Sequence, residues 1–422
     1  MNITKARAVS LICLIAAGEM IFSLPFHITR YFRPTFLATF GLTNATLGDI
    51  FAGYGLVAMA AYFPGGLLAD RLPARLLITL SLIATGVGGL YLLTFPSANG
   101  LRFLFAYWGL TTILLFWAAL LRATREWGGL QQQGLAYGLL DGGRGLMAAL
   151  AASIAVFLFA LIAGDQGADL TPAQRVDGMR AVIMCYTALT FLTALFCWLF
   201  VEKPSAPPEI NDEPSPRLTA ILTNQSIWLQ AVIVLTAYCA YKGLDNYGLY
   251  LVDVLGVDEL KASQFMAATA YLRPLGAIAA GLLADRFRAS TVIVVLFALL
   301  TAIYLFAATN DLGSVGFNLL LVNLGVSFLA VFALRGVYFA LLNEMSIATK
   351  MTGTAIGVVS VVGFAPDVFF YSITGRILDH FPGAQGHHYY FLLLAAIGLI
   401  GFTASLFLFR RVKLQNAAPQ KF

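Results

Sequence analysis

The sequence predicts an all-α membrane protein in which twelve transmembrane helices form two pseudo-symmetric six-helix bundles. Hydrophobic residues make up 59% of the chain and charged residues only 11%, whereas a soluble domain carries about 25% charged residues. The six residues Gly66 to Arg71, with the sequence GLLADR, recur unchanged as Gly281 to Arg286, each time after an apolar run. A repeat over this length indicates two copies of one membrane-embedded half, which is typical of secondary transporters.

Twelve apolar runs are long enough to cross a bilayer, which requires roughly 20 residues per helix. They lie near residues 8–30, 46–69, 76–95, 103–122, 134–162, 180–201, 227–252, 262–284, 290–308, 314–342, 352–376 and 388–409. The first run lacks a small-residue cleavage site, so we interpret it as a span and not as a signal peptide. A proline-rich polar segment follows the sixth run and predicts a linker. The expected domains are residues 1–201, a cytoplasmic linker 202–224 and residues 225–422.

Lys and Arg are distributed unevenly between the two sides of the expected bundle. The side with the termini and the loops after even-numbered runs carries more than twice as many basic residues as the other side. Because basic loops stay in the cytoplasm, we expect a multi-pass inner (cytoplasmic) membrane protein with both termini inside the cell. The net charge of +5 requires no nucleic-acid partner. No nucleophile–base set, cofactor-binding loop or metal-ligand spacing is recognisable, so we expect neither an enzyme nor a cofactor or metal site.

Ionisable residues inside the apolar runs follow a pattern. The third, sixth, ninth and twelfth runs have no charged residue in their apolar cores, which predicts that every third helix faces lipid. The other runs contain Glu19, Arg30, Asp141, Arg144, Lys242, Asp245, Arg273, Arg335 and Asp367. A charge that faces hydrocarbon costs a few kcal/mol or more. These side chains are therefore expected to face one another or a central polar cleft between the bundles.

The segment Gly66-x-Leu68-x-Asp70-Arg71-x-x-x-Arg75 resembles the loop between helices 2 and 3 of major facilitator superfamily transporters. Within that superfamily the chain most resembles the organophosphate:phosphate antiporters and related organic-anion carriers. The matching segments are Leu47-Gly48 with Tyr54-Gly55, Arg122 to Trp127 before Gln133-Gly134, Lys242-Gly243-Leu244-Asp245 and Gly353-Thr354-Ala355. The resemblance implies alternating access and an anion held by one base on helix 1 and one on helix 7. Arg30 and Lys242 are the nearest matches, and His27 is the alternative to Arg30.

Two buried charge pairs and one lone acid suggest binding or coupling roles. Glu19 near mid-membrane is interpreted as a proton-coupling or cation-recognising carboxylate, or as a neutral acid bonded to helix backbone. The pair Asp141 and Arg144 and the pair Lys242 and Asp245 each lie three residues apart on one helix face. Each pair either neutralises itself or acts as a switch that a substrate anion opens.

Three further charges lie on helices 8, 10 and 11. Arg273 precedes Pro274, which favours a kinked helix 8 and a contact with substrate. Arg335 lies nearer the cytoplasmic end and is interpreted as a gate, an interhelical ion pair or a ligand contact. Asp367 follows Pro366 and has the same alternatives.

Residues at the cytoplasmic helix ends are expected to act as a gate. Carboxylates there can meet helix N-termini and arginines of adjacent helices, and Gly65 and Gly66 fit a close helix approach. The predicted gating residues are Gly66, Asp70, Arg71, Arg122, Gly281, Asp285 and Arg286.

We therefore predict a secondary active transporter that moves a small polar organic anion, such as a sugar phosphate, a sugar acid or another carboxylate. Transport would be proton-coupled or an exchange, and the expected partners are the solute, protons and the lipid bilayer, with the protein a monomer. One alternative is a proton-driven exporter of lipophilic or cationic compounds, in which Glu19 meets the cation. A second is a non-transporting membrane sensor. The sequence leaves open the solute, the direction of transport and the choice between symport, antiport and uniport.

Overall fold

The computed structural model describes residues 5–128, 133–164, 170–202, 222–310, 315–345 and 352–417. Most of the predicted linker, residues 203–221, lies outside them. Every regular element in the described residues is a helix. The helices group into two compact units that do not follow the two sequence halves. Unit 1 comprises Met1–Glu209, Asp245–Tyr271 and Asp367–Asp379, and unit 2 comprises Ile210–Leu244, Leu272–Pro366 and His380–Phe422.

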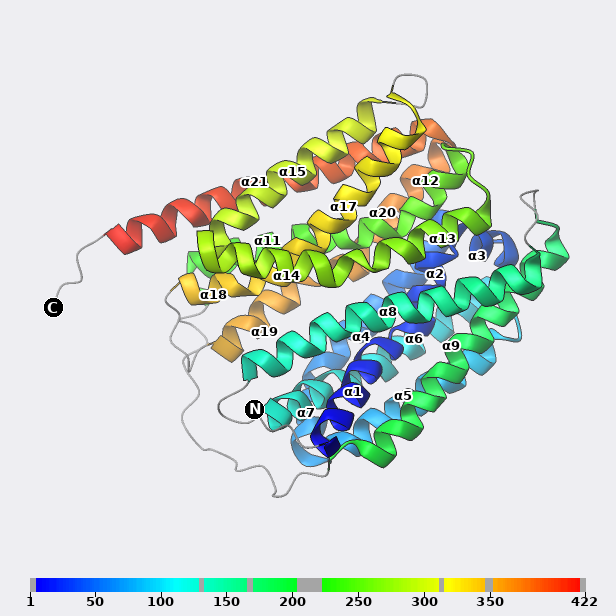
Figure 1. The fold of residues 1–422 in the computed structure, drawn as a ribbon, viewed down its shortest axis with the longest axis horizontal. Helices are drawn as coiled ribbons and strands as arrows, with labels where there is room; N and C mark the ends of the chain where they lie inside the picture. The colour runs from blue at the N-terminus through cyan, green and yellow to red at the C-terminus, as the bar shows by residue number, and fades with distance from the viewer. Residues whose placement is uncertain are drawn as a thin grey trace. The chain divides into compact units, whose positions relative to one another are not determined.

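Unit 1 contains the helices of the N-terminal half and three shorter pieces from the C-terminal half. The N-terminal helices are α1 (Lys5–Met20), η1 (Ser23–His27), α2 (Ile28–Tyr31), α3 (Arg33–Phe40), α4 (Asn44–Arg71), α5 (Ala74–Leu92), α6 (Ala98–Thr112), η2 (Ile113–Trp117), α7 (Ala118–Gly128), α8 (Gln133–Ala163) and α9 (Pro172–Phe200). The three pieces are α12 (Tyr247–Asp253), α13 (Glu259–Ala270) and α20 (Pro366–His380). Helix α1 packs against α8 and α9, and α13 packs along α8 (Figure 1). The sequence halves thus interleave inside one compact unit.

Unit 2 contains the remaining helices of the C-terminal half. They are α11 (Gln225–Gly243), α14 (Leu272–Phe287), α15 (Ala289–Thr309), α17 (Phe317–Val337), η4 (Tyr338–Ala340), α18 (Leu341–Glu344), α19 (Thr352–Gly363) and α21 (Ala384–Ala417). Helix α21 packs against α11 and α15, and α17 packs against α14 and α15. The 3-10 turn η3 (Leu244–Asn246) links α11 of unit 2 to α12 of unit 1.

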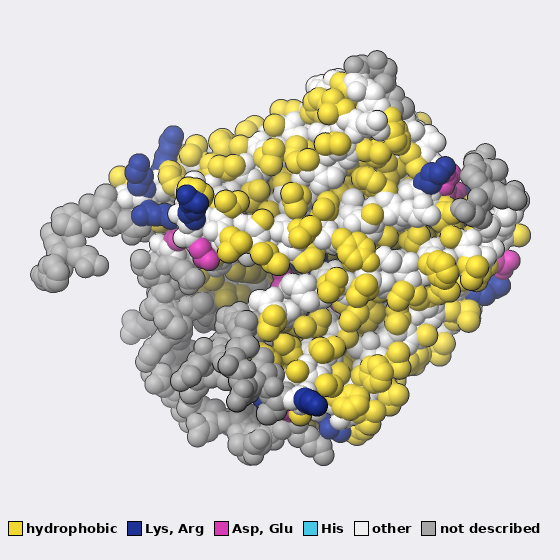
Figure 2. Space-filling model, viewed as in Figure 1, with side chains coloured by type: hydrophobic (Ala, Val, Ile, Leu, Met, Phe, Trp, Pro, Cys, Tyr) yellow, Lys and Arg dark blue, Asp and Glu magenta, His cyan; other side chains and the backbone are white. Residues whose placement is uncertain are grey.

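The predicted twelve-span fold is confirmed. Within the described residues, eleven stretches are long and apolar enough to cross a membrane, and the bent pair Lys5–Met20 and Ser23–Tyr31 supplies a twelfth. Hydrophobic side chains cover the middle of the helices on the face shown in Figure 2, and Lys and Arg gather near helix ends. Large apolar side chains are exposed on α5, α9, α15 and α21, as expected, but also on α8 and α14. The exposed apolar surface therefore includes more helices than the third, sixth, ninth and twelfth, which the sequence predicted.

Prolines explain where two spans break. Pro25 has no N–H to donate to Ile21, and the first span bends by 41° and continues as the π-helical turn η1. Pro274 likewise leaves the carbonyl of Ala270 without its helical donor, and α13 ends at that residue. Helix α14 begins at Leu272, so the helix is interrupted at Tyr271, and the predicted kink stays a prediction.

Candidate functional site

A buried acid and two bases meet in the first span of unit 1. His27 Nε2 lies 3.2 Å from Glu19 Oε1, and Arg144 Nε on α8 donates to Glu19 Oε2 over 3.1 Å. The Glu19 side chain is only 4% exposed. The Arg144 guanidinium also lies 5.8 Å from the centre of the Phe22 ring. His27 and Arg144 therefore each contact one oxygen of the Glu19 carboxyl group.

The bend in the first span makes the contact between Glu19 and His27 possible. In a straight α-helix eight residues advance about 12 Å and turn about 80° away from the starting face. The bend after Met20 and the π-helical turn η1 change both the direction and the phase of the helix. Gly18 adds to this arrangement, because a Cβ there would lie 3.0 Å from Cδ of Arg144. The sequence signals are Pro25 and Gly18 on either side of the acid.

Asp245 forms the second buried charge cluster. Arg30 Nε donates to Asp245 Oδ1, and the Tyr371 hydroxyl donates to Asp245 Oδ2 over 2.5 Å. The Tyr371 ring stacks on Phe51 with the ring centres 4.3 Å apart. The prediction that Lys242 and Asp245 share one face of an α-helix is wrong, because α11 ends at Gly243 and Asp245 lies in η3. The i,i+3 geometry of an α-helix therefore does not apply to that pair.

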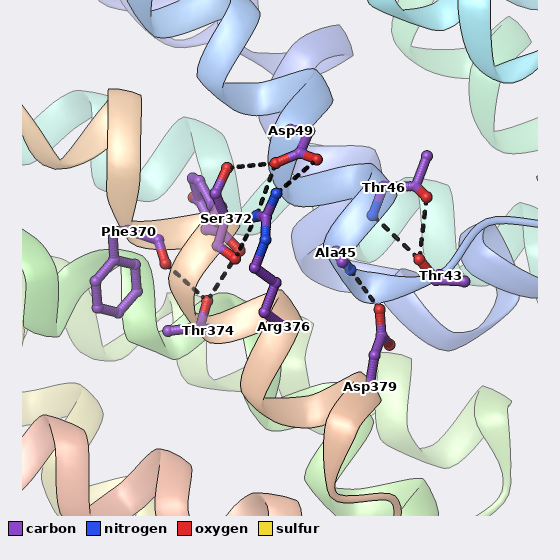
Figure 3. Close-up of polar contacts among 10 residues, drawn as sticks. Thr43, Ala45, Thr46, Asp49, Phe370, Ser372, Thr374, Arg376 and Asp379 are labelled. Carbon is purple, nitrogen blue, oxygen red and sulfur yellow. Dashed lines mark hydrogen bonds and ion pairs between the residues drawn. The ribbon is translucent and has the colours of Figure 1, made fainter.

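Helices α4 and α20 are joined by polar contacts at the N-terminal end of α4 (Figure 3). Arg376 donates to both carboxylate oxygens of Asp49, over 2.9 and 3.1 Å, and Ser372 donates to Asp49 over 2.8 Å. Asp379 accepts from the backbone N–H of Asn44 at 3.0 Å and of Ala45 at 2.6 Å. This carboxylate caps α4 from another helix, where the unsatisfied N–H groups and the helix dipole favour a negative charge. We call these contacts the α4–α20 clasp.

Glycines bring the two backbones of the clasp together. A Cβ at Gly48 would lie 2.3 Å from the carbonyl oxygen of Tyr371, and one at Gly55 would lie 2.6 Å from that of Asp367. A Cβ at Gly375 on α20 would lie 2.3 Å from the carbonyl oxygen of Asn44. No larger residue fits at these positions without separating the helices. Gly48 and Gly55 are seven residues apart and hence on one face of α4, which is the sequence signal for this contact.

A further polar contact joins the halves of the sequence within unit 1. Glu259, at the start of α13, accepts from Arg175 Nε over 2.8 Å and from the Thr35 hydroxyl over 2.6 Å. The sequence analysis did not predict a contact between Arg175 and Glu259. Their charges lie at helix starts, where sequence patterns do not distinguish an ion pair from a solvated group.

In unit 2 the described contacts of Arg335 on α17 are with aromatic rings. Its guanidinium carbon lies 3.7 Å from the centre of the Tyr241 ring and 6.0 Å from that of Tyr238, both on α11. Nη1 of Arg335 is buried and has no hydrogen-bond acceptor among the described residues. Lys242 is buried, with Nζ 5.1 Å from the centre of the Tyr238 ring. The two tyrosines were not predicted, because aromatic residues in an apolar run are indistinguishable from packing.

The other predicted binding residues lie in different places. Arg273 is buried in the first turn of α14 in unit 2, and Asp141 is half-buried one turn before Arg144 on α8. Asp367 lies in the first turn of α20, where its backbone meets Gly55. The predicted residues therefore divide between two clusters in unit 1 and a group in unit 2.

The predicted cytoplasmic gating residues are only partly brought together. Arg122 on α7 donates to Glu126 over 2.7 Å and to the carbonyl of Ala69 at the C-terminal end of α4. Asp70 and Arg71 form the last turn of α4, and the Asp70 side chain lies outside the described part of the chain. In unit 2, Asp285 and Arg286 are exposed, and Arg286 lies over the Phe287 ring. One described base therefore contacts the repeat segment of the first half.

The predicted close helix approach is present at Gly65 but not at Gly66. No described atom lies within 4 Å of a Cβ built on Gly66 or on Gly281. The close approaches occur one position earlier in the first half and five earlier in the second. A Cβ at Gly65 would lie 2.8 Å from the carbonyl oxygen of Leu114, and one at Gly276 would lie 2.8 Å from that of Leu329.

Comparison with known proteins places this arrangement in a family. The sequence matches the Major Facilitator Superfamily over residues 11–371. It is 27% identical over 430 residues to the Inner membrane protein YqcE of Escherichia coli (strain K12), covering 98% of this chain and 97% of the relative. It is 28% identical over 434 residues to the Inner membrane protein YihN of the same organism, covering 97% of each.

The fold is similar to that of a bacterial homolog of the human lysosomal transporter Spinster, solved in an inward-facing and occupied conformation. The TM-score is 0.79 with 16% identity, covering 99% of this chain and 100% of that chain. At this identity the likeness concerns the fold alone. The family match covers most of the chain, and we conclude that this protein belongs to the Major Facilitator Superfamily of membrane transporters.

Proposed function

We propose that this transporter moves a small polar organic anion, such as a sugar phosphate, a sugar acid or another carboxylate, across the inner membrane by alternating access. Lys242, Arg273 and Arg335 supply positive charge to the solute, and Glu19, Asp141 and Asp245 tune or couple its movement. Coupling is to protons or to a counter-anion. The resemblance to the organophosphate:phosphate antiporters stays a prediction. The proposal is limited to small polar organic anions as the class of solute.

The observation that carries this proposal is the environment of Arg335. A guanidinium inside a membrane span is costly unless its donors are satisfied. Here it has tyrosine faces beside it and a buried Nη1 without an acceptor among the described residues. An acid group of the solute would satisfy that donor and neutralise the charge. Lys242 and Arg273 also lie within the spans of unit 2 and contribute two further positive charges.

The surroundings of Glu19 favour an anion carrier over the alternative exporter of cations. An acid that recognises a lipophilic cation needs a carboxylate that faces the solute. Glu19 instead contacts His27 and Arg144, and its side chain is only 4% exposed. We propose that this cluster couples transport. A proton that binds Glu19 would compete with the two bases for its carboxylate, and a solute acid group would compete with Glu19 for the two bases.

We propose that the two ends of α4 act as opposite gates. The helix has 28 residues and is therefore about 42 Å long, enough to cross the membrane. The clasp lies at its N-terminal end and the Arg122 contact at its C-terminal end. If both termini of the chain are cytoplasmic, the clasp is external. Alternating access then requires the clasp to open when the external side admits solute.

Uptake into proteoliposomes tests this function. Purified protein would be given a panel of labelled sugar phosphates, sugar acids and short carboxylates, with and without an imposed pH gradient. Saturable uptake that is lost in Lys242→Ala is expected, and dependence on the gradient and on Glu19 in Glu19→Gln would indicate proton coupling. Transport of cationic dyes with no anion uptake would contradict the proposal and favour the exporter.

A further inference from the structure

Several aromatic rings lie near Arg335 in unit 2. Tyr241 lies against the guanidinium, and the ring of the buried Phe332 is tilted relative to Tyr241 with the ring centres 6.4 Å apart. Tyr238 stacks beside Tyr241 at 6.0 Å and meets Phe364 edge-to-face at 5.0 Å. We call Tyr238, Tyr241 and Phe364 the aromatic wall. All three are half-buried, as is Arg335, so this set keeps accessible surface within the spans.

Stacking restricts how the guanidinium can present its donors. A guanidinium that lies on a ring face has that face covered and keeps its N–H groups directed outward in its own plane. Such an edge matches two oxygens of one acid group, as in bidentate recognition of carboxylate or phosphate. The buried Nη1 of Arg335, which lacks an acceptor among the described residues, belongs to this edge. Tyr241 is thus a positioning residue for the base.

The accessible surface beside this base is aromatic. The guanidinium carbon lies 6.0 Å from the centre of the Tyr238 ring, and Phe364 adjoins that ring. An acid group bound at Arg335 would therefore place the rest of the solute against ring faces. A small inorganic anion would leave those faces unused, whereas a ring with C–H groups or π-electrons gains packing there.

We infer that Arg335 and the aromatic wall form a subsite for a ring-bearing organic acid, in which Arg335 binds the acid group and the ring packs on Tyr238 and Phe364. The solute class is a cyclic sugar acid or an aryl carboxylate. Acyclic acids and inorganic anions bind there through charge alone and hence more weakly. This inference rests on the proposed anion transport and specifies which anions are preferred.

Competition for uptake of labelled glucuronate into proteoliposomes tests the subsite. The competitors are glucuronate, benzoate, acetate, inorganic phosphate and nitrate. Wild-type protein should prefer the cyclic acids over acetate and nitrate. In Arg335→Lys the charge remains but the fork is lost, so affinity for cyclic acids should fall about tenfold or more. Nitrate inhibition should change little.

The aromatic variants separate ring packing from hydrogen bonding. Tyr241→Phe keeps the stacked ring and should retain near wild-type affinity, whereas Tyr241→Leu and Tyr238→Leu should lose about three- to tenfold for cyclic acids alone. Matched controls are Arg411→Lys, whose guanidinium contacts Gln225, and Tyr389→Leu, an exposed ring on α21. Neither control should change the preference.

The outcomes separate this inference from the proposed function. If wild-type protein transports organic anions but Arg335→Lys and Tyr238→Leu keep wild-type preference, the subsite is wrong and the transport proposal stands. Equal inhibition of the wild-type protein by cyclic and acyclic acids also overturns the subsite. If the wild-type protein takes up no organic anion, both proposals fail together.

Discussion

The arginines of the two units have different partners. In unit 1, Arg144 donates to Glu19 and Arg30 donates to Asp245, so each guanidinium has a buried carboxylate beside it. In unit 2, Arg335 has tyrosine rings beside it and no carboxylate among its described contacts. A buried ion pair is strongly destabilised when one partner is removed, because the other charge remains. A stacked arginine without an acid partner has no such dependence on another side chain.

This difference assigns different tasks to chemically identical side chains. The paired arginines of unit 1 hold segments of the chain together, since Arg30 and Asp245 lie 215 residues apart. The stacked arginine of unit 2 is oriented but retains donors for a ligand. Stability should therefore respond most to loss of the Arg30–Asp245 pair, and the affinity for solute most to loss of Arg335. The variants that follow run from the largest expected change in stability to the smallest.

Asp245→Asn should give the largest loss of stability. The change removes the charge that compensates Arg30 in a buried site, which costs about 3–5 kcal/mol for pairs of this kind. Thermal unfolding of the purified protein in detergent measures it. The double variant Arg30→Met with Asp245→Asn should recover much of the loss, because no uncompensated charge remains. A single variant that unfolds at the wild-type temperature would show that the pair holds nothing together.

Gly48→Ala should disturb the α4–α20 clasp. The added Cβ would lie 2.3 Å from the carbonyl oxygen of Tyr371, so the helices must separate, at a cost of about 1–3 kcal/mol. Gly53→Ala is the matched control on the same helix, since no described atom lies within 4 Å of its Cβ. Thermal unfolding and labelling of a cysteine introduced at the buried Phe51 report the separation. Equal behaviour of the two variants would contradict the glycine contact.

Asp379→Ala should have a smaller effect. Removing a side chain that caps a helix N-terminus typically costs about 1 kcal/mol. Asp379→Asn should lose less, because its single amide oxygen still accepts from one of the two N–H groups, of Asn44 and Ala45, that now donate to separate carboxylate oxygens. The difference between the two variants in thermal unfolding measures the cap. A loss as large as that of Asp245→Asn would mean that an exposed contact matters as much as a buried pair.

Arg335→Met should change stability least. The variant removes a partly buried charge and keeps an apolar side chain that can pack on Tyr241, so the free energy of unfolding should stay within about 1 kcal/mol of wild type. The measurement is the thermal unfolding temperature of Arg335→Met, compared with that of Asp245→Asn under the same conditions. A large destabilisation would indicate that Arg335 is a structural residue like Arg30.

The apolar runs and the GLLADR repeat were enough to predict the fold, because span length and backbone satisfaction leave a membrane chain few alternatives. The pairing of Arg30 with Asp245 was missed. Their separation of 215 residues equals that of Gly66 and Gly281, so they occupy equivalent positions of the repeat. That numerical coincidence was a usable signal.

Other contacts could not be derived from a single sequence. Pro25 and Gly18 indicate a bend near Glu19, but the contact with His27 depends on a π-helical turn, and a straight α-helix would separate the two residues by about 12 Å. The tyrosines beside Arg335 have the composition of ordinary packing residues. The sequence predicts which charged residues lie inside the spans. Which residues they contact depends on tertiary structure, which the sequence pattern does not give.

The most direct test of the account is glucuronate uptake by Arg335→Met in proteoliposomes, normalised to folded protein and compared with wild type. We predict saturable uptake by wild type and a loss of most of that uptake in a variant that unfolds at nearly the wild-type temperature. Wild-type rates and affinity in Arg335→Met would contradict this prediction, because the arginine whose described contacts are aromatic rings would then have no part in binding the anion.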